Sequence, residues 1–144
     1  MPNRRTHDHL VAFNFAIEIE GITQGPVTYI GGLGACTDVL DVKDGNTVVR
    51  RQRPGQTHYN SLTVRRGFTN TDELFDWYAR TRAGTVERKS LSVILFGDDA
   101  SSEIARFNFF EAWPCRWELL PLSSDDSGVL EEEIEIVVEL MERA

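Results

Sequence analysis

The histidines of this 144-residue chain are the first residues to consider for chemistry, and their spacing supports little of it. His7, Asp8 and His9 could in principle bind a metal, but they lie in a polar N-terminal segment with no further ligand nearby. We expect residues 1–9 to form a flexible tail, because chain termini are usually mobile unless they are tied down. His58 has no Ser or Cys nucleophile arranged around it in the sequence, which argues against a nucleophilic triad.

The other candidates for chemistry favour structural roles. Asp98 and Asp99 follow a glycine, and neighbouring carboxylates in such a segment form turns more often than acid–base pairs. The glycine-rich segment 31–34 lacks a phosphate-binding lysine and precedes a strand pattern instead of a helix. Cys36 and Cys115 belong to no Cys-x-x-Cys pair, so we expect two buried free thiols. The sequence therefore predicts no enzyme activity, no cofactor and no metal site.

The composition disfavours several classes of binding partner. Hydrophobic residues make up 41% of the chain and charged residues 26%, which is typical of a soluble globular domain. The net charge of −8 argues against binding to nucleic acid or to an anionic membrane, since both depend on basic surfaces. No apolar run is long enough for a transmembrane helix, and no signal-peptide pattern follows the N-terminus. We expect a protein kept in the cytoplasm, or released by a route that needs no signal.

Alternating hydrophobic and polar residues predict a chain built mainly from β-strands. Phe13, Phe15, Ile17 and Ile19 alternate with smaller or polar residues, which is the period of a half-buried strand. Pro114 argues that its strand lies at a sheet edge or starts there. Further strands are predicted at residues 35–42, 59–66, 91–95, 104–110, 113–120 and 130–140.

One segment, at about residues 71–83, has the pattern of a helix. Leu74 and Trp77 fall on one apolar stripe, and Asn70 or Thr71 can cap the N-terminus ahead of an acidic first turn. The predicted fold class is mainly β (α+β): an antiparallel β-barrel or sandwich of two packed sheets with one flanking α-helix. Residues 10–144 suit a single domain with one core.

The segment at about residues 43–55 is predicted to be an exposed extended loop. A Lys-Asp-Gly-Asn turn pattern opens it and a Pro-Gly pair closes it. Between them lie Arg50, Arg51 and Arg53, which would be unfavourable in a hydrophobic core. An exposed, basic extension is therefore the expected structure of this segment.

The last predicted strand carries glutamates on one face and aliphatic residues on the other. Glu131, Glu133, Glu135 and Glu139 share the polar face, where their like charges repel one another. One interpretation is an ordinary solvated sheet face. The other is the wall of a water-filled channel, where charge keeps the surface hydrated and discourages sticking of passing cargo.

Several segments, taken in order, resemble the T4-type phage tail tube protein family. This family includes tube proteins of extracellular contractile injection systems and R-type-pyocin-like particles, and its fold is similar to that of the type VI secretion tube protein. The resemblance covers roughly residues 10–142. The segments that carry it are Pro-Gly-Gln-Thr-His-Tyr at 54–59, Leu-Thr-Val-Arg-Arg-Gly at 62–67, Glu-Leu-Phe-Asp-Trp-Tyr at 73–78, Gly-Thr-Val-Glu-Arg-Lys at 84–89, Arg-Phe-Asn-Phe at 106–109 and Ala-Trp-Pro at 112–114.

The resemblance implies a structural subunit without catalytic residues or cofactor. Such subunits form homo-hexameric rings that stack into a hollow inner tube, inside a contractile sheath and on a baseplate with a spike. Effector cargo or DNA passes through the lumen, and the subunit itself binds no membrane. By this analogy the particle is assembled in the bacterial cytoplasm and belongs to a phage tail or to a released or anchored phage-tail-like particle.

The same resemblance gives roles to the two charged segments. Arg50, Arg51 and Arg53 would contact an acidic surface of the neighbouring ring, and Glu131, Glu133, Glu135 and Glu139 would face the lumen. The segment 123–131 departs from the family pattern before the last strand. This departure allows an alternative, a tube-end adaptor, initiator or plug protein that forms a single ring. A monomeric barrel that binds a small ligand is the third interpretation.

Overall fold

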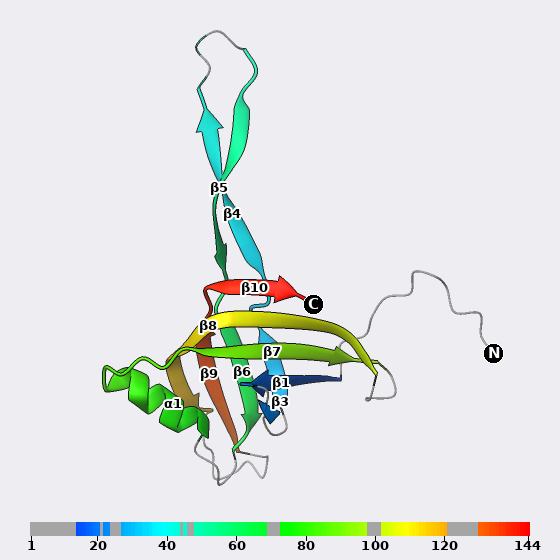
Figure 1. Ribbon diagram of the computed structural model, residues 1–144. Coiled ribbons are helices and arrows are strands. Elements are labelled where there is room, and N and C mark those ends of the chain that lie inside the picture. The colour runs from blue at the N-terminus through cyan, green and yellow to red at the C-terminus, as the bar shows by residue number, and fades with distance from the viewer. Residues whose placement is uncertain are drawn as a thin grey trace, which may run out of the picture.

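The structure is a computed structural model that describes residues 14–20, 22–23, 27–43, 45, 48–68, 73–97, 102–120 and 130–144. It is mainly β with one helix, as the sequence predicts (Figure 1). The described elements are β1 (Phe15–Ile19), β2 (Ile22–Thr23), β3 (Val27–Gly31), β4 (Ala35–Val42), β5 (Arg51–Tyr59), β6 (Leu62–Gly67), α1 (Glu73–Arg82), β7 (Lys89–Phe96), β8 (Glu103–Leu119), β9 (Glu131–Val137) and β10 (Leu140–Arg143).

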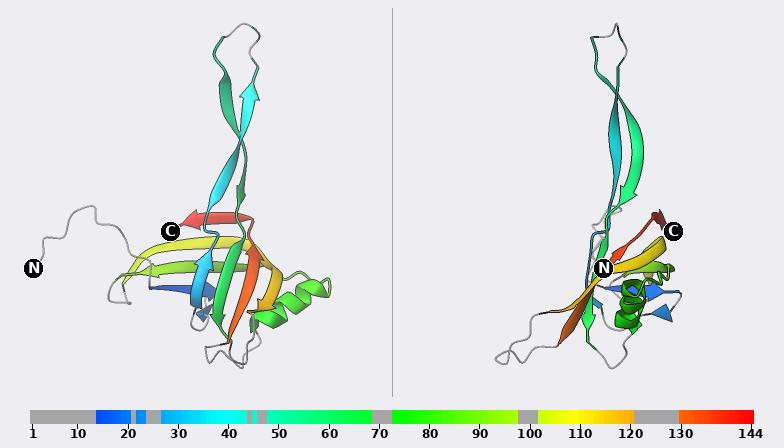
Figure 2. Two further views of the ribbon diagram at one scale, coloured as in Figure 1. Left: turned by 180° about the vertical axis from the view of Figure 1, so that it is seen from behind. Right: turned by 90° about the vertical axis from the view of Figure 1, so that its left-hand side faces the viewer.

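The strands of the body form two antiparallel layers that share one long strand. The hydrogen-bonded order is β2-β1-β7-β8-β9-β6-β3, and β10 pairs with β8 on the side of the first layer. The first half of β8 pairs with β7, whereas its second half pairs with β9. Figures 1 and 2 show that the strands of one layer run across those of the other. This arrangement confirms the predicted sandwich of two antiparallel sheets.

The strand β8 replaces the two separate strands predicted at residues 104–110 and 113–120. Glu111 adopts a φ of 55°, and the register shifts between Pro114 and Arg116, so the strand bends while it passes from one layer to the other. Pro114 lies in the second half of β8, which pairs with β9 alone among the described strands, so the predicted edge position is confirmed. A strand start is wrong, because β8 begins at Glu103. A bulge tolerates proline because one residue there makes no ladder hydrogen bond.

The core lies between the two layers and beneath the helix. Ile17 and Ile19 of β1 point inward, as their alternation predicts, and meet inward residues of both layers. The helix lies within the predicted range of 71–83 and buries Leu74 and Trp77 on one stripe. The indole Nε1 of Trp77 donates a hydrogen bond to the carbonyl oxygen of Glu87 at 2.7 Å, which ties the helix to the segment that follows it.

The chain leaves the body through a bend that requires glycine. Gly32 has a φ of +86°, and a Cβ there would lie 2.0 Å from the carbonyl oxygen of Ser61. Past this bend β4 pairs with β5, so the β3–β6 ribbon of the body continues outward as a second ribbon. The helical part of the described residues contains no segment that is both long and apolar enough to cross a membrane.

Candidate assembly surfaces

The ribbon of β4 and β5 projects far from the body, and we call residues 35–59 the arm (Figures 1 and 2). Every residue of β4 is exposed, and so are most residues of β5. The arm begins at residue 35, earlier than the extended loop predicted at residues 43–55. The prediction missed residues 35–42 because their strand pattern does not show that this strand lies outside the body. An isolated two-stranded ribbon is only marginally stable in water, so contact with another surface would stabilise the arm.

The arm separates the three arginines that the sequence grouped together. Arg50 donates two hydrogen bonds to the carboxylate of Asp41, from Nε to Oδ1 at 3.1 Å and from Nη2 to Oδ2 at 3.0 Å. Arg51 lies opposite Val42, and Arg53 lies opposite Leu40. Directly paired residues of an antiparallel ribbon share one face, so Arg51 and Arg53 lie beside aliphatic side chains.

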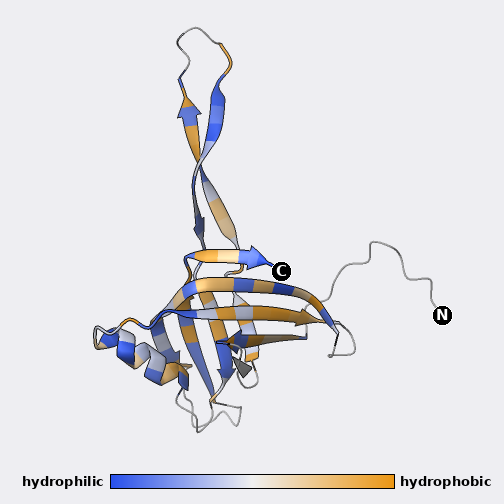
Figure 3. Cartoon of the chain, viewed as in Figure 1, coloured by the Kyte–Doolittle hydropathy of each residue, from blue (hydrophilic) through white to orange (hydrophobic). Residues whose placement is uncertain are grey.

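The arm also exposes aliphatic side chains to an unusual degree. Val39 is 65% exposed, Val49 is 71% exposed and Val48 is fully exposed. Figure 3 shows hydrophobic residues distributed between hydrophilic ones along the arm. Apolar side chains concentrated on one projecting element typically mark a surface that contacts another protein.

The base of the arm brings together residues that the sequence analysis considered separately. His58 pairs with Cys36 across the ribbon, and its Nε2 lies 3.0 Å from Oδ1 of Asp38. All three are exposed. Within the part of the chain that the structure describes, no group of three His, Cys, Asp or Glu side chains could hold a metal ion. His7, Asp8, His9, Asp98 and Asp99 lie outside the described residues.

Both cysteines are exposed, which corrects the prediction of two buried thiols. Cys36 is exposed because its strand belongs to the arm and not to the core. Cys115 lies at the register shift of β8. Partial desolvation and the nearby carboxylate of Glu135 raise the pKa of the Cys115 thiol, which makes it a weaker nucleophile at neutral pH.

The glutamate face of β9 is interleaved with arginines from the neighbouring strands. Glu133 accepts hydrogen bonds from Arg65 Nε at 3.0 Å and from Arg116 Nη1 at 3.3 Å. Arg116 Nε also donates to Glu135 at 3.2 Å, and Glu131 accepts a hydrogen bond from Thr28. The repulsion expected between these glutamates is therefore offset by ion pairs within the subunit.

Glu133 is the most protected member of this face, with an exposed fraction of 5%. Burial alone would raise the pKa of its carboxyl group. The hydrogen bonds donated by Arg65 and Arg116 outweigh that effect and hold the pKa below its ordinary value. Glu133 is consequently ionised at neutral pH although it is buried.

Glu139 does not lie on the same strand as the other three glutamates. The single strand predicted at residues 130–140 is wrong, because β9 ends at Val137 and β10 starts at Leu140. Glu139 lies at this corner, is exposed and forms an ion pair with Arg88. The chain turns here because β10 leaves the layer of β9 and pairs with β8 in the other layer.

Sequence reasoning missed a buried ion pair on the opposite face of β9. Arg66 Nε lies 2.6 Å from Oε1 of Glu132, and each side chain is 3% exposed. Trp117 Nε1 donates to the other carboxylate oxygen of Glu132 at 2.8 Å. A glutamate at an inward position between Glu131 and Ile134 was the only sequence signal, and it does not identify the partner.

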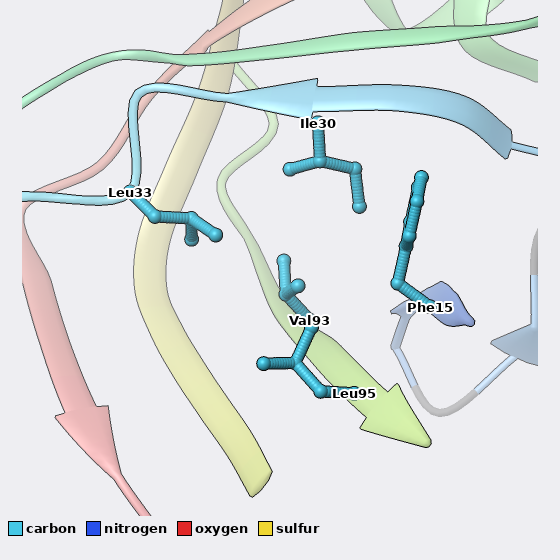
Figure 4. A pocket seen from close by; sticks show the side chains of 5 residues that line it. All are labelled: Phe15, Ile30, Leu33, Val93 and Leu95. Atoms are coloured by element: carbon cyan, nitrogen blue, oxygen red, sulfur yellow. The ribbon is translucent and has the colours of Figure 1, made fainter. Parts of the chain in front are cut away.

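A small apolar pocket lies where β1, β3 and β7 approach one another (Figure 4). Its volume of about 100 Å³ is well below the roughly 300–1,000 Å³ typical of small-molecule sites. Its lining contains no charged side chain and consists of Phe15, Ile30, Leu33, Val93 and Leu95. This pocket therefore gives no support to a ligand-binding barrel.

Comparison with known proteins identifies relatives of the whole domain. A family model described as T4-like virus tail tube protein gp19 matches residues 11–142. Among curated proteins, the comparison found no match.

Several solved structures resemble the chain over nearly its full length. One is described as the sheath/tube terminator of an extracellular contractile injection system, PVC, in the extended state; it has a TM-score of 0.86 and 20% identity over 97% of this chain and 99% of that chain. The PVC sheath-tube complex in the extended state has a TM-score of 0.85 and 21% identity, and the match covers 96% of this chain and 93% of that chain. The anti-feeding prophage tube terminating cap has a TM-score of 0.86 and 16% identity, and the match covers 99% of this chain and 95% of that chain. These likenesses show that the chain has the tail-tube fold.

Proposed function

Because the chain belongs to the T4-like virus tail tube protein gp19 family, we propose that it forms rings within the inner tube of a contractile injection system. The family is structural and not enzymatic, in agreement with the expectation from the sequence. The observation that supports this proposal best is the arm, a solvent-exposed ribbon whose apolar side chains are not buried within the single subunit. A ring closed by head-to-tail contacts presents such an element to neighbouring copies.

We favour a ring at the end of a tube over the repeating subunit of the tube. Two of these similar structures carry descriptions of tube ends, a terminator and a terminating cap. Another is described as a sheath–tube complex, which supports the repeating subunit as the other candidate. In either position, a contractile sheath and a baseplate with its spike are the proposed neighbours, and the bacterial cytoplasm is the proposed place of assembly.

The glutamate face of β9 remains our proposal for the wall of the channel. Glu131, Glu133 and Glu135 share this face with Arg65 and Arg116, so it is polar and only partly neutralised. Water reaches it through the half-exposed side chains of Arg65 and Arg116, whereas Glu133 lies shielded beneath them. Such a wall suits the passage of effector cargo or DNA, because it offers few apolar contacts. Glu139 is ion-paired at the corner beyond β9, and we leave it out of this proposal.

Negative-stain electron microscopy of the purified chain, combined with size-exclusion chromatography and light scattering, tests these assignments. Single closed rings that do not lengthen at high concentration are expected for a tube-end protein. Long stacked tubes would favour the repeating subunit. A stable monomer of 16.3 kDa at every concentration would contradict both.

A further inference from the structure

The arm has two faces with different chemistry. The first, which we call the contact face, carries Leu40, Val42, Arg51 and Arg53, since Leu40 pairs with Arg53 and Val42 pairs with Arg51. The second, which we call the braced face, carries Val39, Asp41, Arg50, Gln52 and Pro54. The pairing register fixes this division, because side chains alternate between the faces of a strand.

The braced face is satisfied within the arm. The guanidinium of Arg50 holds both carboxylate oxygens of Asp41 in a bidentate pair. The two side chains are 72% and 51% exposed, so water screens the ion pair and the pair adds little to stability. Its consequence is that Arg50 and Asp41 neutralise each other and offer little net charge to a partner.

The contact face is unsatisfied by comparison. Among the residues that the structure describes, no carboxylate lies within ion-pairing distance of Arg51 or Arg53. Leu40 lies over Gly55, where a Cβ would come within 3.1 Å of its Cγ, yet Leu40 remains 41% exposed. Val42 is 40% exposed. Arg51 and Arg53, on one face of the strand beside two exposed aliphatic side chains, form a surface suited to an acidic partner with some apolar character.

The distribution of charge along the chain favours a second copy as that partner. Residues 35–59 contain four Lys or Arg and three Asp or Glu, so the arm is slightly basic. The rest of the chain contains 11 Lys or Arg and 20 Asp or Glu, so the body is strongly acidic. Complementary charge steers association and fixes its orientation, and here the two signs lie on different parts of the same molecule.

We infer that Leu40, Val42, Arg51 and Arg53 dock onto an acidic surface of a second copy, whereas Arg50 braces the arm through Asp41 and makes no required contact. This inference rests on the proposed ring assembly and refines it, since the three arginines no longer act as one group. It names Arg51 and Arg53 as the specificity-determining residues of the arm.

Two charge variants with equal numbers of substitutions test the division. Arg51→Glu with Arg53→Glu reverses the contact face, and it should raise the concentration needed for half-maximal assembly by about tenfold or more. Asp41→Arg with Arg50→Glu exchanges the two charges of the ion pair on the braced face. The concentration that this variant needs for half-maximal assembly should stay within about threefold of the value for the unmodified chain. Circular dichroism of dilute samples checks that both variants fold. Equal losses in the two variants, or unchanged assembly of the first, would overturn the inference.

A photo-crosslinking amino acid at position 42 or at position 52 then identifies the partner. Val42 lies on the contact face and Gln52, opposite Asp41, lies on the braced face, so the second position is a matched control. We expect a dimer of this chain cross-linked from position 42, with an acidic peptide of the body as its other half, and little product from position 52. Cross-links from position 52 alone, or only to another macromolecule, would contradict the inference. Absence of any oligomer of the unmodified chain would instead contradict the proposed function.

Discussion

Replacement of Glu132 is expected to destabilise the fold more than replacement of any exposed glutamate. Glu132 and Arg66 are each 3% exposed, and Trp117 donates to the same carboxylate. Removing one partner of a buried ion pair leaves an uncompensated charge and typically costs 3–5 kcal/mol. Glu132→Ala should therefore remove a large part of the roughly 5–15 kcal/mol that stabilises a domain of ordinary size.

Urea unfolding followed by tryptophan fluorescence and circular dichroism measures this effect. The measurement is made at several protein concentrations, because assembly adds apparent stability that depends on concentration. The expected loss of about 3–5 kcal/mol corresponds to a fall in melting temperature on the order of 10–20 °C for a domain of this size.

A control variant and a double variant distinguish the effect of breaking the buried ion pair from the effect of removing a glutamate side chain. Glu118→Ala removes a half-exposed partner of Arg116 on the same sheet and should cost about 1 kcal/mol or less. Arg66→Met with Glu132→Leu replaces both charges by apolar groups and should recover most of the loss, since such replacements are often neutral. If Glu132→Ala costs no more than Glu118→Ala, the buried pair is not the stabilising element we describe.

Three further predictions concern single sites. Gly32→Ala should prevent the bend into the arm, because of its positive φ and the short approach to Ser61, whereas Gly45→Ala, with nothing within 4 Å, should leave circular dichroism and assembly unchanged. Trp77→Ala should cost about 3–5 kcal/mol in urea unfolding, since the side chain is 2% exposed and fills the space under the helix. The pKa of Glu133 is lowered in the folded state, so its ionised carboxylate stabilises the fold at pH values above the ordinary glutamate pKa of 4.5. This stabilisation is lost as the pH falls below 4.5, so Glu133→Gln should make the free energy of unfolding depend less on pH in the acid range.

Local patterns were sufficient to predict β1 and α1 of the body. The two-residue period of Phe15, Ile17 and Ile19 depends only on neighbours in sequence, and β1 buries its inward residues accordingly. The stripe of Leu74 and Trp77 likewise depends on helical spacing alone, and α1 lies within the predicted range. Periodicity reports which face of an element is buried, and this is the information that these predictions used.

Pairing between distant strands could not be predicted in the same way. Arg65 and Arg66 are adjacent in sequence, but the register of β6 with β9 directs one to Glu133 on the outer face and the other to Glu132 in the core. A shift of one residue would exchange the two faces, and no local pattern fixes that register. The exposure of Cys36 has the same origin, because the sequence of β4 does not say that its strand pairs only with β5.

The arginines alter what the glutamate face can do as a channel wall. Three of the four carboxylates on this face, those of Glu118, Glu133 and Glu135, pair with the guanidinium groups of Arg65 and Arg116, whereas Glu131 accepts a hydrogen bond from Thr28. The side chains that pair are held in place, and the excess negative charge is about half of what the glutamates alone suggest. A wall of this kind stays hydrated through fixed charges of both signs, and it repels an anionic cargo less strongly than a wall of glutamates would. The charge that matters to a cargo is therefore set by three strands together, and not by the glutamate pattern of β9.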